Sequence, residues 1–223
     1  MSVFWRPRGC VLWYDFAELS GDTVYDLSGN NNHGTIYNCE WRRGHLIGSL
    51  YFNGENAYVY VPNPIKLLPP FSLECFAYVT TTGREYQTLI SRRDLSDNTN
   101  YALRLWNDSI EFYFKDVDTG NWVIHKAFDV VKTGWHYFYG GYDGSEVVIV
   151  YDGEVVSTAS ETRTPQTEFV HSEEIGSIKS GTREFWYGLI AHVRIYNRVL
   201  SQREIRAHAN YLLQKYIAHP PFI

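Results

Sequence analysis

Pairs of carboxylates on one strand are the first arrangement in this sequence that could do chemistry. A retaining glycoside hydrolase needs its two carboxyl groups about 5 Å apart, a spacing that alternate residues of one strand provide. Glu111 and Asp116 are five positions apart and therefore fall on opposite faces of a strand. The adjacent Glu173 and Glu174 also point to opposite faces, and Glu74 is alone on its strand. No strand of the sequence carries the pair that this chemistry requires.

Other catalytic signatures are missing as well. The sequence contains no Gly-x-Ser-x-Gly nucleophile turn, no His-Glu-x-x-His zinc site and no phosphate-binding loop. A polysaccharide lyase would need a tyrosine–histidine pair beside an arginine or asparagine that neutralises a uronate, and such a set could still assemble in space. We interpret His125, His136 and His192 as strand residues that face solvent or a satisfied interior. The sequence therefore predicts a protein that is not an enzyme.

The stretch "DLSGNNNHGTI" gathers polar side chains that could bind a metal ion. Asp26 and the asparagines offer hard oxygen ligands of the kind that Ca²⁺ prefers, but an EF-hand also needs alternating acidic residues and a closing glutamate. The interpretation that we prefer is a compact turn, in which Asp26 and Ser28 bind nearby backbone N–H groups. Gly29, residues 30–32 and Gly34 would then accept left-handed backbone angles.

The three cysteines are Cys10, Cys39 and Cys75, and no two of them have the spacing of a zinc site. We interpret them as buried free thiols, because unpaired cysteine behaves as a small hydrophobic residue. A disulfide between Cys10 and Cys39 is the alternative if their strands turn out to be neighbours.

Aromatic side chains make up 17% of the residues, and such rings suit both β-sheets and carbohydrate contacts. A sugar site usually combines a flat ring with polar side chains that bind the hydroxyls. Alternation along the strands places Arg104 with Trp106, and Glu74 with Tyr78, on single faces. If the strands adjoin, one groove would be lined by five candidate ligand-binding residues: Glu74, Tyr78, Arg104, Trp106 and Trp122. The alternative is that these rings only pack between the sheets or under loops.

The elements that must position these residues are almost all strands. Before residue 200 the apolar pattern has period two or occurs in short runs, broken by Gly, Asp and Asn turns. The predicted strands are 11–16, 34–38, 49–52, 58–61, 71–80, 86–92, 101–106, 109–115, 122–128, 135–142, 146–151, 154–160, 173–178 and 189–196. So many short strands at regular spacing predict an all-β, two-sheet antiparallel sandwich.

One helix is predicted at the C-terminal end. Ser201 and Glu204 form a capping box, and apolar residues recur at helical spacing over 202–216. The Pro-Pro pair that follows cannot continue a helix, so "IAHPPFI" is predicted as an extended apolar tail. No Pro/Gly/Ser-rich linker divides the chain. We expect residues 1–200 to form the sandwich, and 201–223 to be a helix and tail of the same domain.

Composition and charge exclude several classes of partner. The formal net charge is −5 with no basic cluster, so a phosphate-neutralising nucleic-acid face is not expected. No stretch reaches the roughly 18 apolar residues that a membrane span needs. The first residues lack the apolar segment and cleavage site of a signal peptide, and the sequence leaves the localisation open.

Five stretches of the sequence follow the order and spacing of one known family. They are "WYDFAELSGDTVYDLSGNNNHGTIYN", "FNGENAYVYVP", "FSLECFAYV", "WHYFYGGYDGSEVVIVYDGEVV" and "YGLIAHVRIYNRVLSQREI". On these stretches the chain resembles laminin-G-like, concanavalin-A-like jelly-roll domains, in a branch often appended to surface proteins. The resemblance covers residues 11–210 and implies a jelly-roll sandwich with a short C-terminal helix.

The same resemblance bears on calcium. Many jelly rolls of this type hold a structural calcium beside the last strand, with an acidic residue among the ligands. This sequence has Ala191 and His192 in that stretch, and Asp15 is the acidic residue that remains from the first strand. One carboxylate makes a weak site, because Ca²⁺ affinity follows the charge and rigidity of the ligands. We predict no metal site and no cofactor, with a weak structural Ca²⁺ as the alternative.

Three functions remain for a fold that hosts lectins, adhesins, hydrolases and structural modules. The first is non-catalytic recognition of a carbohydrate or a cell-surface partner. The alternative is a structural or assembly protein, such as a virion component, that uses the jelly roll as a rigid brick. In that case the tail with Phe222 and Ile223 would insert into a neighbouring copy and build a homo-oligomer. A glycoside hydrolase or polysaccharide lyase ranks third.

Overall fold

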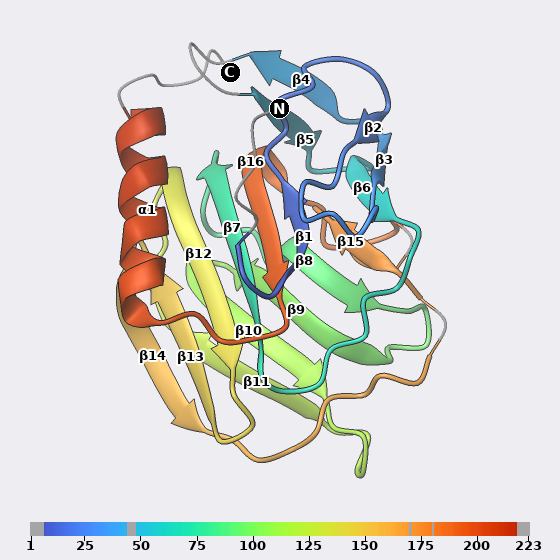
Figure 1. Ribbon diagram of the computed structural model, residues 1–223, viewed down its shortest axis with the longest axis vertical. Coiled ribbons are helices and arrows are strands. Elements are labelled where there is room, and N and C mark those ends of the chain that lie inside the picture. The colour runs from blue at the N-terminus through green and yellow to red at the C-terminus, as the bar shows by residue number, and fades with distance from the viewer. Residues whose placement is uncertain (1–6, 44–47, 170, 180, 218–223) are drawn as a thin grey trace.

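The computed structural model describes residues 7–43, 48–169, 171–179 and 181–217. Within these residues the chain forms sixteen β-strands and one α-helix. The strands build two antiparallel sheets that face each other, and the helix lies on the outer side of one of them (Figure 1). The predicted fold class, a two-sheet jelly-roll sandwich with a C-terminal helix, is confirmed.

Sheet A is the sheet that the helix covers. Its strands in spatial order are β14 (Glu154–Ser160), β13 (Glu146–Tyr151), β12 (Gly134–Tyr142), β7 (Phe71–Val79), β16 (Tyr187–Tyr196), β5 (Gly48–Asn53) and β4 (Glu40–Arg43), and β1 (Cys10–Tyr14) also pairs with β16. The ten residues of β16 pair with β7 along one side, and with β5 and then β1 along the other. The first and last strands of the chain therefore lie side by side.

Sheet B forms the opposite layer of the sandwich. Its strands in spatial order are β11 (Trp122–Ala127), β10 (Ser109–Lys115), β9 (Thr99–Trp106), β8 (Gln87–Arg93), β15 (Glu173–Ile175), β6 (Tyr58–Val61), β3 (Gly34–Tyr37) and β2 (Thr23–Val24). The pairing of β8 with β15 brings together residues that are far apart in the chain. It places the loop after β15 beside β8, where the Thr88 N–H donates to the Glu184 carbonyl at 2.8 Å.

The core lies between the two sheets and follows the period-two pattern of the strands. On β6, Val59 and Val61 point inward and are fully buried, whereas Tyr58 and Tyr60 point outward. The inner faces approach closely at Gly140 of β12. A Cβ atom there would lie 2.3 Å from the ring of Phe112 in sheet B, so only glycine fits without a shift of that ring.

Helix α1 (Gln202–Ile217) covers the outer face of sheet A. Its start is a capping box: the Ser201 N–H donates to the Glu204 carboxylate at 2.9 Å, and the Glu204 N–H donates to Ser201 Oγ at 3.3 Å. Ile205, Ala209 and Leu212 form the buried face of the helix. This apolar stripe is what holds the helix on the sheet.

Two strands were not predicted, and several boundaries differ. The short strands β2 and β4 have no clear apolar alternation, and β4 reads "EWRR". Pairing with β3 and β5 makes them strands, so tertiary contact decides them. The predicted strand 173–178 ends at Ile175, because Gly176 adopts φ +83° and turns the chain.

Other sequence expectations concern the ends of the chain and its cysteines. The predicted apolar arm with Phe222 and Ile223 lies outside the described residues. Among the described residues, no helix combines the length and apolar character needed to cross a membrane. Cys10, Cys39 and Cys75 are free, so the alternative Cys10–Cys39 disulfide is absent.

Candidate functional site

The five residues predicted to line one groove belong to two different sheets. Arg104 and Trp106 lie on β9, and Trp122 lies on β11, all on the outer face of sheet B. Glu74 and Tyr78 lie on β7, in sheet A. The prediction of a single groove is therefore wrong, because the strands that carry these residues do not adjoin.

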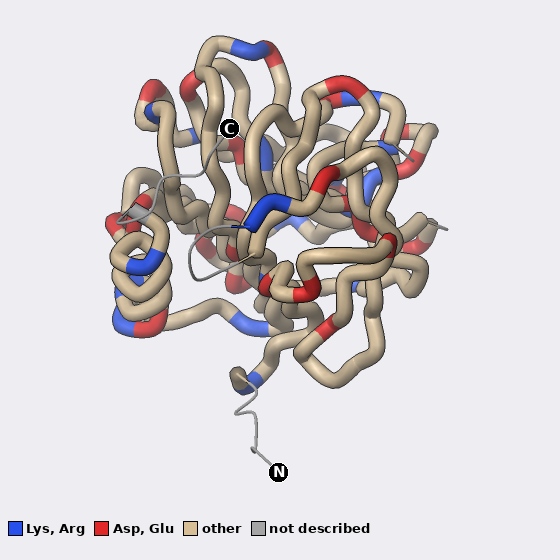
Figure 2. Tube along the Cα trace, turned by 90° about the horizontal axis from the view of Figure 1, so that it is seen from above, with Lys and Arg blue, Asp and Glu red and all other residues tan. Residues whose placement is uncertain are grey.

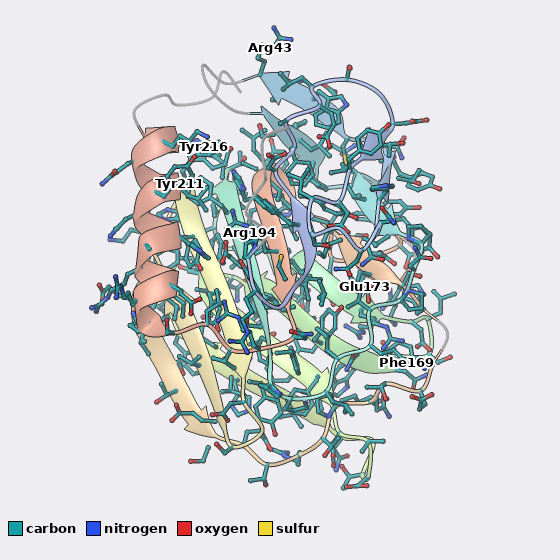
Figure 3. All side chains as sticks on the ribbon, in the orientation of Figure 1. Arg43, Phe169, Glu173, Arg194, Tyr211 and Tyr216 are labelled. Carbon is teal, nitrogen blue, oxygen red and sulfur yellow. The ribbon has the colours of Figure 1, made fainter. Side chains whose placement is uncertain are left out.

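Glu74 lies between sheet A and helix α1. The Glu74 side chain is fully buried and accepts hydrogen bonds from Arg194 Nη1 at 2.6 Å and His208 Nδ1 at 2.8 Å. Arg194 extends from β16, near the centre of Figure 3. The Tyr78 ring packs edge-on against Trp135. Glu74 thus connects the helix to sheet A, whereas Tyr78 packs against another strand of that sheet, and neither residue lines the sheet B hollow.

The outer face of sheet B carries a hollow of about 310 Å³. We call it the sheet B hollow. Its lining comes from four strands of the sheet and from three loops, and consists of Tyr86, Arg93, Asp97, Arg104, Tyr113, Trp122, Ile124 and Glu184. Arg104 and Trp122 are thus brought together as the sequence suggested. Trp106 is on the same face but outside the lining, with Lys126 Nζ over its ring at 3.9 Å.

Arg104 organises the floor of the sheet B hollow. Its guanidinium lies between the rings of Tyr86 and Tyr113, 4.2 and 4.3 Å from their centroids. Its N–H groups donate to Glu111 at 2.7 Å and to Glu184 at 2.9 Å. Because both faces and most donors of Arg104 are engaged by the protein, we infer that it positions its neighbours.

Trp122 and Ile124 form the apolar wall of the hollow. Trp122 is 37% exposed, and beside it on the same face of β11 Ile124 is 39% exposed. Arg93 stacks over Trp122 at 4.6 Å, and Tyr113 meets the indole edge-on at 5.7 Å. Burial raises the pKa of Tyr113 to about 12, so its hydroxyl stays protonated at neutral pH. The wall therefore combines a partly exposed indole with the Arg93 guanidinium that lies over it.

Glu184 enters the hollow from the loop before β16. Its backbone has φ +55°, a left-handed conformation that is uncommon for a residue other than glycine. Its carboxylate accepts from Arg104 at 2.9 Å, from Arg93 at 3.3 Å and from Thr88 Oγ1 at 3.1 Å. These bonds hold the strained loop residue in place and fix a carboxylate at the rim.

Sequence reasoning missed several residues of the hollow. Alternation along β10 places Tyr113 on the same face as Glu111, which pairs with Arg104, and that pattern could have identified it. Asp97 and Glu184 lie in loops, where no periodicity applies. Asp97 accepts from Arg93 Nη2 and from Lys179 Nζ, each at 2.6 Å. Glu184 reaches the site only through long-range pairing, whereas Asp97 lies in the turn between β8 and β9, four residues from Arg93.

The asparagine-rich stretch is a turn built on the carboxylate of Asp26. Its Oδ1 accepts from the N–H groups of Trp13 at 3.0 Å and Ser28 at 2.8 Å. Its Oδ2 accepts from Ser28 Oγ at 2.8 Å and the Asn32 N–H at 3.0 Å. Of the residues expected to be left-handed, Gly29 and Asn31 are. Within the described ranges no three His, Cys, Asp or Glu side chains group as metal ligands, and the weak calcium site stays untested.

Replacing Asp26 by alanine should destabilise the sandwich by about 1–3 kcal/mol, because buried donors lose their acceptor. Asp26 is only 7% exposed, so water cannot fully replace the carboxylate. Urea denaturation of the variant measures the change. The matched control is Asp22→Ala in the preceding exposed turn, for which no comparable loss is expected. Equal stabilities of the two variants would contradict this account of the loop.

The three histidines assigned to strands have different surroundings. His125 bonds Glu161 at 3.1 Å, and His136 bonds Asp152 at 2.8 Å. His192 differs, because it is buried under α1 and neither ring nitrogen has a hydrogen-bond partner among the described residues. The expectation of a satisfied interior is wrong for His192. Burial, together with the nearby Arg194, lowers its pKa well below the ordinary value and keeps the ring neutral.

Comparison with known proteins agrees with this architecture. The sequence model of a laminin-G family, described as belonging to the concanavalin A-like lectin/glucanases superfamily, matches residues 52–206. None of the curated proteins matches the chain.

Several solved structures share the fold at low sequence identity. Domain 4 of AbnA, an extracellular arabinanase from Geobacillus stearothermophilus solved in complex with arabinotriose, has TM-score 0.71 and 18% identity, over 90% of this chain and 98% of that one. The receptor-binding domain of botulinum neurotoxin type G has TM-score 0.67 and 13% identity, over 91% and 51%. The binding domain of Paraclostridial mosquitocidal protein 1 has TM-score 0.71 and 18% identity, over 91% and 52%. This chain thus spans about half the length of the toxin domains.

Proposed function

Because the chain belongs to the concanavalin A-like lectin/glucanases superfamily, which spans binding modules and enzymes, we propose that it is a non-catalytic carbohydrate-recognition module. The proposed site is the sheet B hollow. The observation that carries the proposal is the partly exposed side chain of Trp122, which lines a hollow together with charged side chains that ion pairs hold in place.

The chemistry of the hollow suits a pyranose or furanose ring. The exposed part of the Trp122 side chain offers apolar surface for the C–H face of a sugar. Asp97, Glu184 and Arg93 offer acceptors and donors for hydroxyl groups at the border of that ring. At about 310 Å³ the hollow is at the lower end of ligand-site volumes, which suits one sugar unit of a longer chain.

Two further observations support recognition over hydrolysis. Glu184 and Glu111 are the carboxylates nearest the floor of the hollow, and both are bound by Arg104. Carboxylate oxygens that are engaged by arginine in this way are not free to contact a substrate as an acid or a nucleophile. Domain 4 of AbnA, which shares the fold, was solved with arabinotriose. A neutral oligosaccharide is therefore a reasonable first probe for this chain.

The test is a glycan array that includes arabinotriose, followed by titration of the best binder. Replacing Trp122 by alanine should weaken binding at least about tenfold, equivalent to about 1.4 kcal/mol, because the stacking surface is lost. Trp106→Ala is the matched control, since this tryptophan lies on the same face outside the hollow and its loss should leave affinity unchanged. Binding that survives Trp122→Ala, or that disappears equally in Trp106→Ala, would place the site elsewhere.

A further inference from the structure

A second hollow of about 480 Å³ adjoins the sheet B hollow. It is lined by Arg84, Glu85, Tyr86, Arg183 and Glu184, so that Tyr86 and Glu184 form a shared wall between the two. We propose that this second hollow binds the anionic group of an acidic sugar, next to the sugar unit that occupies the sheet B hollow. The inference rests on the proposed function and adds the chemical class of the ligand.

Arg183 is the residue that points to an anion. Its side chain is exposed at the rim, and it makes no hydrogen bond or ion pair with another side chain in the described part of the protein. Its neighbour Arg84 is occupied, because Nη2 donates to the Gly54 carbonyl at 2.9 Å and the guanidinium stacks over the Tyr187 ring. Arg183 thus keeps its planar set of donors free for a carboxylate or sulfate group.

The backbone that carries Arg183 is held in a tight turn. The Ile178 N–H donates to the Arg183 carbonyl, and the Thr182 N–H donates to the Ile178 carbonyl, each at 3.2 Å. Lys179 anchors the turn to the rim of the sheet B hollow through Asp97 at 2.6 Å, and the Gly181 N–H donates to Glu174 at 3.0 Å. A fixed backbone reduces the ordering that ligand binding would require.

Charge across the two hollows also favours an anion. Four arginines and three carboxylates line them, whereas the chain as a whole carries a formal net charge of −5. Figure 2 shows acidic and basic positions dispersed over the rest of the chain. The Glu184 carboxylate is already bound by Arg93 and Arg104, so it repels an incoming anion less than a free carboxylate would. Among the described residues Arg84, Arg183 and Glu85 make no ion pair, so two cations face one unpaired carboxylate in the second hollow, and Arg183 is the cation whose donors are free.

The experiment compares acidic glycans with their neutral counterparts on one array. The array carries each uronate glycan together with its methyl ester, and each sulfated glycan together with its desulfated form. Wild-type protein should prefer the charged member of a pair by about tenfold, the size expected for one charge-assisted hydrogen-bonded contact. Preference within the uronate pairs or within the sulfate pairs identifies which anion is bound. The preference should fall at high salt.

Arg183→Gln should remove the preference and leave binding of the neutral members unchanged. The matched control is Arg203→Gln, which removes one exposed positive charge from helix α1, and it should keep the preference. Equal binding of both members by the wild type, or a preference that survives Arg183→Gln, would overturn the inference. Trp122-dependent binding without charge preference would leave the proposed function intact. If the wild-type protein binds no glycan on the array, both the proposed function and this inference are wrong.

Discussion

Replacing Glu74 by alanine is expected to lower the free energy of unfolding by about 3–5 kcal/mol, because the change leaves a buried arginine without its partner. Glu74 is fully buried between sheet A and helix α1, where Arg194 and His208 donate to its two oxygens at 2.6 and 2.8 Å. Urea denaturation at neutral pH measures the loss. A loss below about 1 kcal/mol would mean that the pair has little effect on stability.

The ion pair between Glu154 and Arg206 is a matched control for this prediction. It also joins helix α1 to sheet A, at 2.9 Å, but both side chains are more than half exposed. Water screens such a pair, so Glu154→Ala should cost less than about 1 kcal/mol. Glu74→Leu combined with Arg194→Met should recover much of the loss, because an apolar pair needs no desolvation of charge.

The contribution of Glu74 should also depend on pH. Burial by itself would raise the pKa of this carboxyl, but Arg194 and His208 outweigh burial and lower it from 4.5 to about 2. A carboxyl with a depressed pKa stabilises the fold above its ordinary pKa and loses that effect as the pH falls through the folded value. The wild type should therefore lose about 3 kcal/mol between pH 4.5 and 2. The Glu74→Ala variant should lack this part of the acid dependence.

Replacing Glu173 by glutamine is expected to have the opposite sign and to stabilise the protein at alkaline pH. Glu173 is fully buried in sheet B, and its Oε2 has no hydrogen-bond partner among the described residues. Arg92 Nε lies 3.6 Å from Oε1, because the N–H groups of Arg92 donate to the carbonyls of Thr167, Phe169 and His171. Burial therefore outweighs Arg92 and raises the pKa of Glu173 from 4.5 to about 7.

The sign of the pH dependence follows from that raised pKa. Between pH 4.5 and 7 the folded protein binds a proton at Glu173 that the unfolded chain has already released, so stability falls as the pH rises through this window. The loss is about 3 kcal/mol for a shift of this size. Glutamine has no charge to bury and can still accept from the Ile65 N–H, which donates to Glu173 at 2.7 Å. The variant should therefore be more stable than wild type at pH 8.

Unfolding free energies of wild type and Glu173→Gln, measured by urea denaturation from pH 5 to pH 8, test this expectation. The two curves should lie close together at the acidic end and separate as the pH rises. Glu168→Gln, at an exposed glutamate on the neighbouring loop, is the control and should follow the wild type. Parallel curves for wild type and Glu173→Gln would show that Glu173 does not titrate in this window.

Most of the strands, the helix and the fold class follow from the sequence without knowledge of strand pairing, whereas the short strands β2 and β4 do not. Alternation such as that of Val59 and Val61 with Tyr58 and Tyr60 is local, so it can be read without knowing which strands pair. The capping box at Ser201 and the turn at Asp26 are also local, because the side chain and the backbone groups that it binds lie within a few residues. The same local pattern placed Arg104 and Trp106 on one outer face.

The tertiary structure alone decided which residues share a site. Alternation reports the face of a residue but not the sheet of its strand, and β7 joins sheet A by pairing with β12 and β16, both far along the chain. Alternation therefore cannot show that Glu74 and Tyr78 lie in sheet A, apart from Arg104 and Trp106 in sheet B. Glu184 reaches the sheet B hollow from a loop that the pairing of β8 with β15 delivers. Turns and helix caps form between residues that are neighbours in the sequence. A binding site instead depends on the pairing of strands that are distant in the sequence, and no short stretch contains that information.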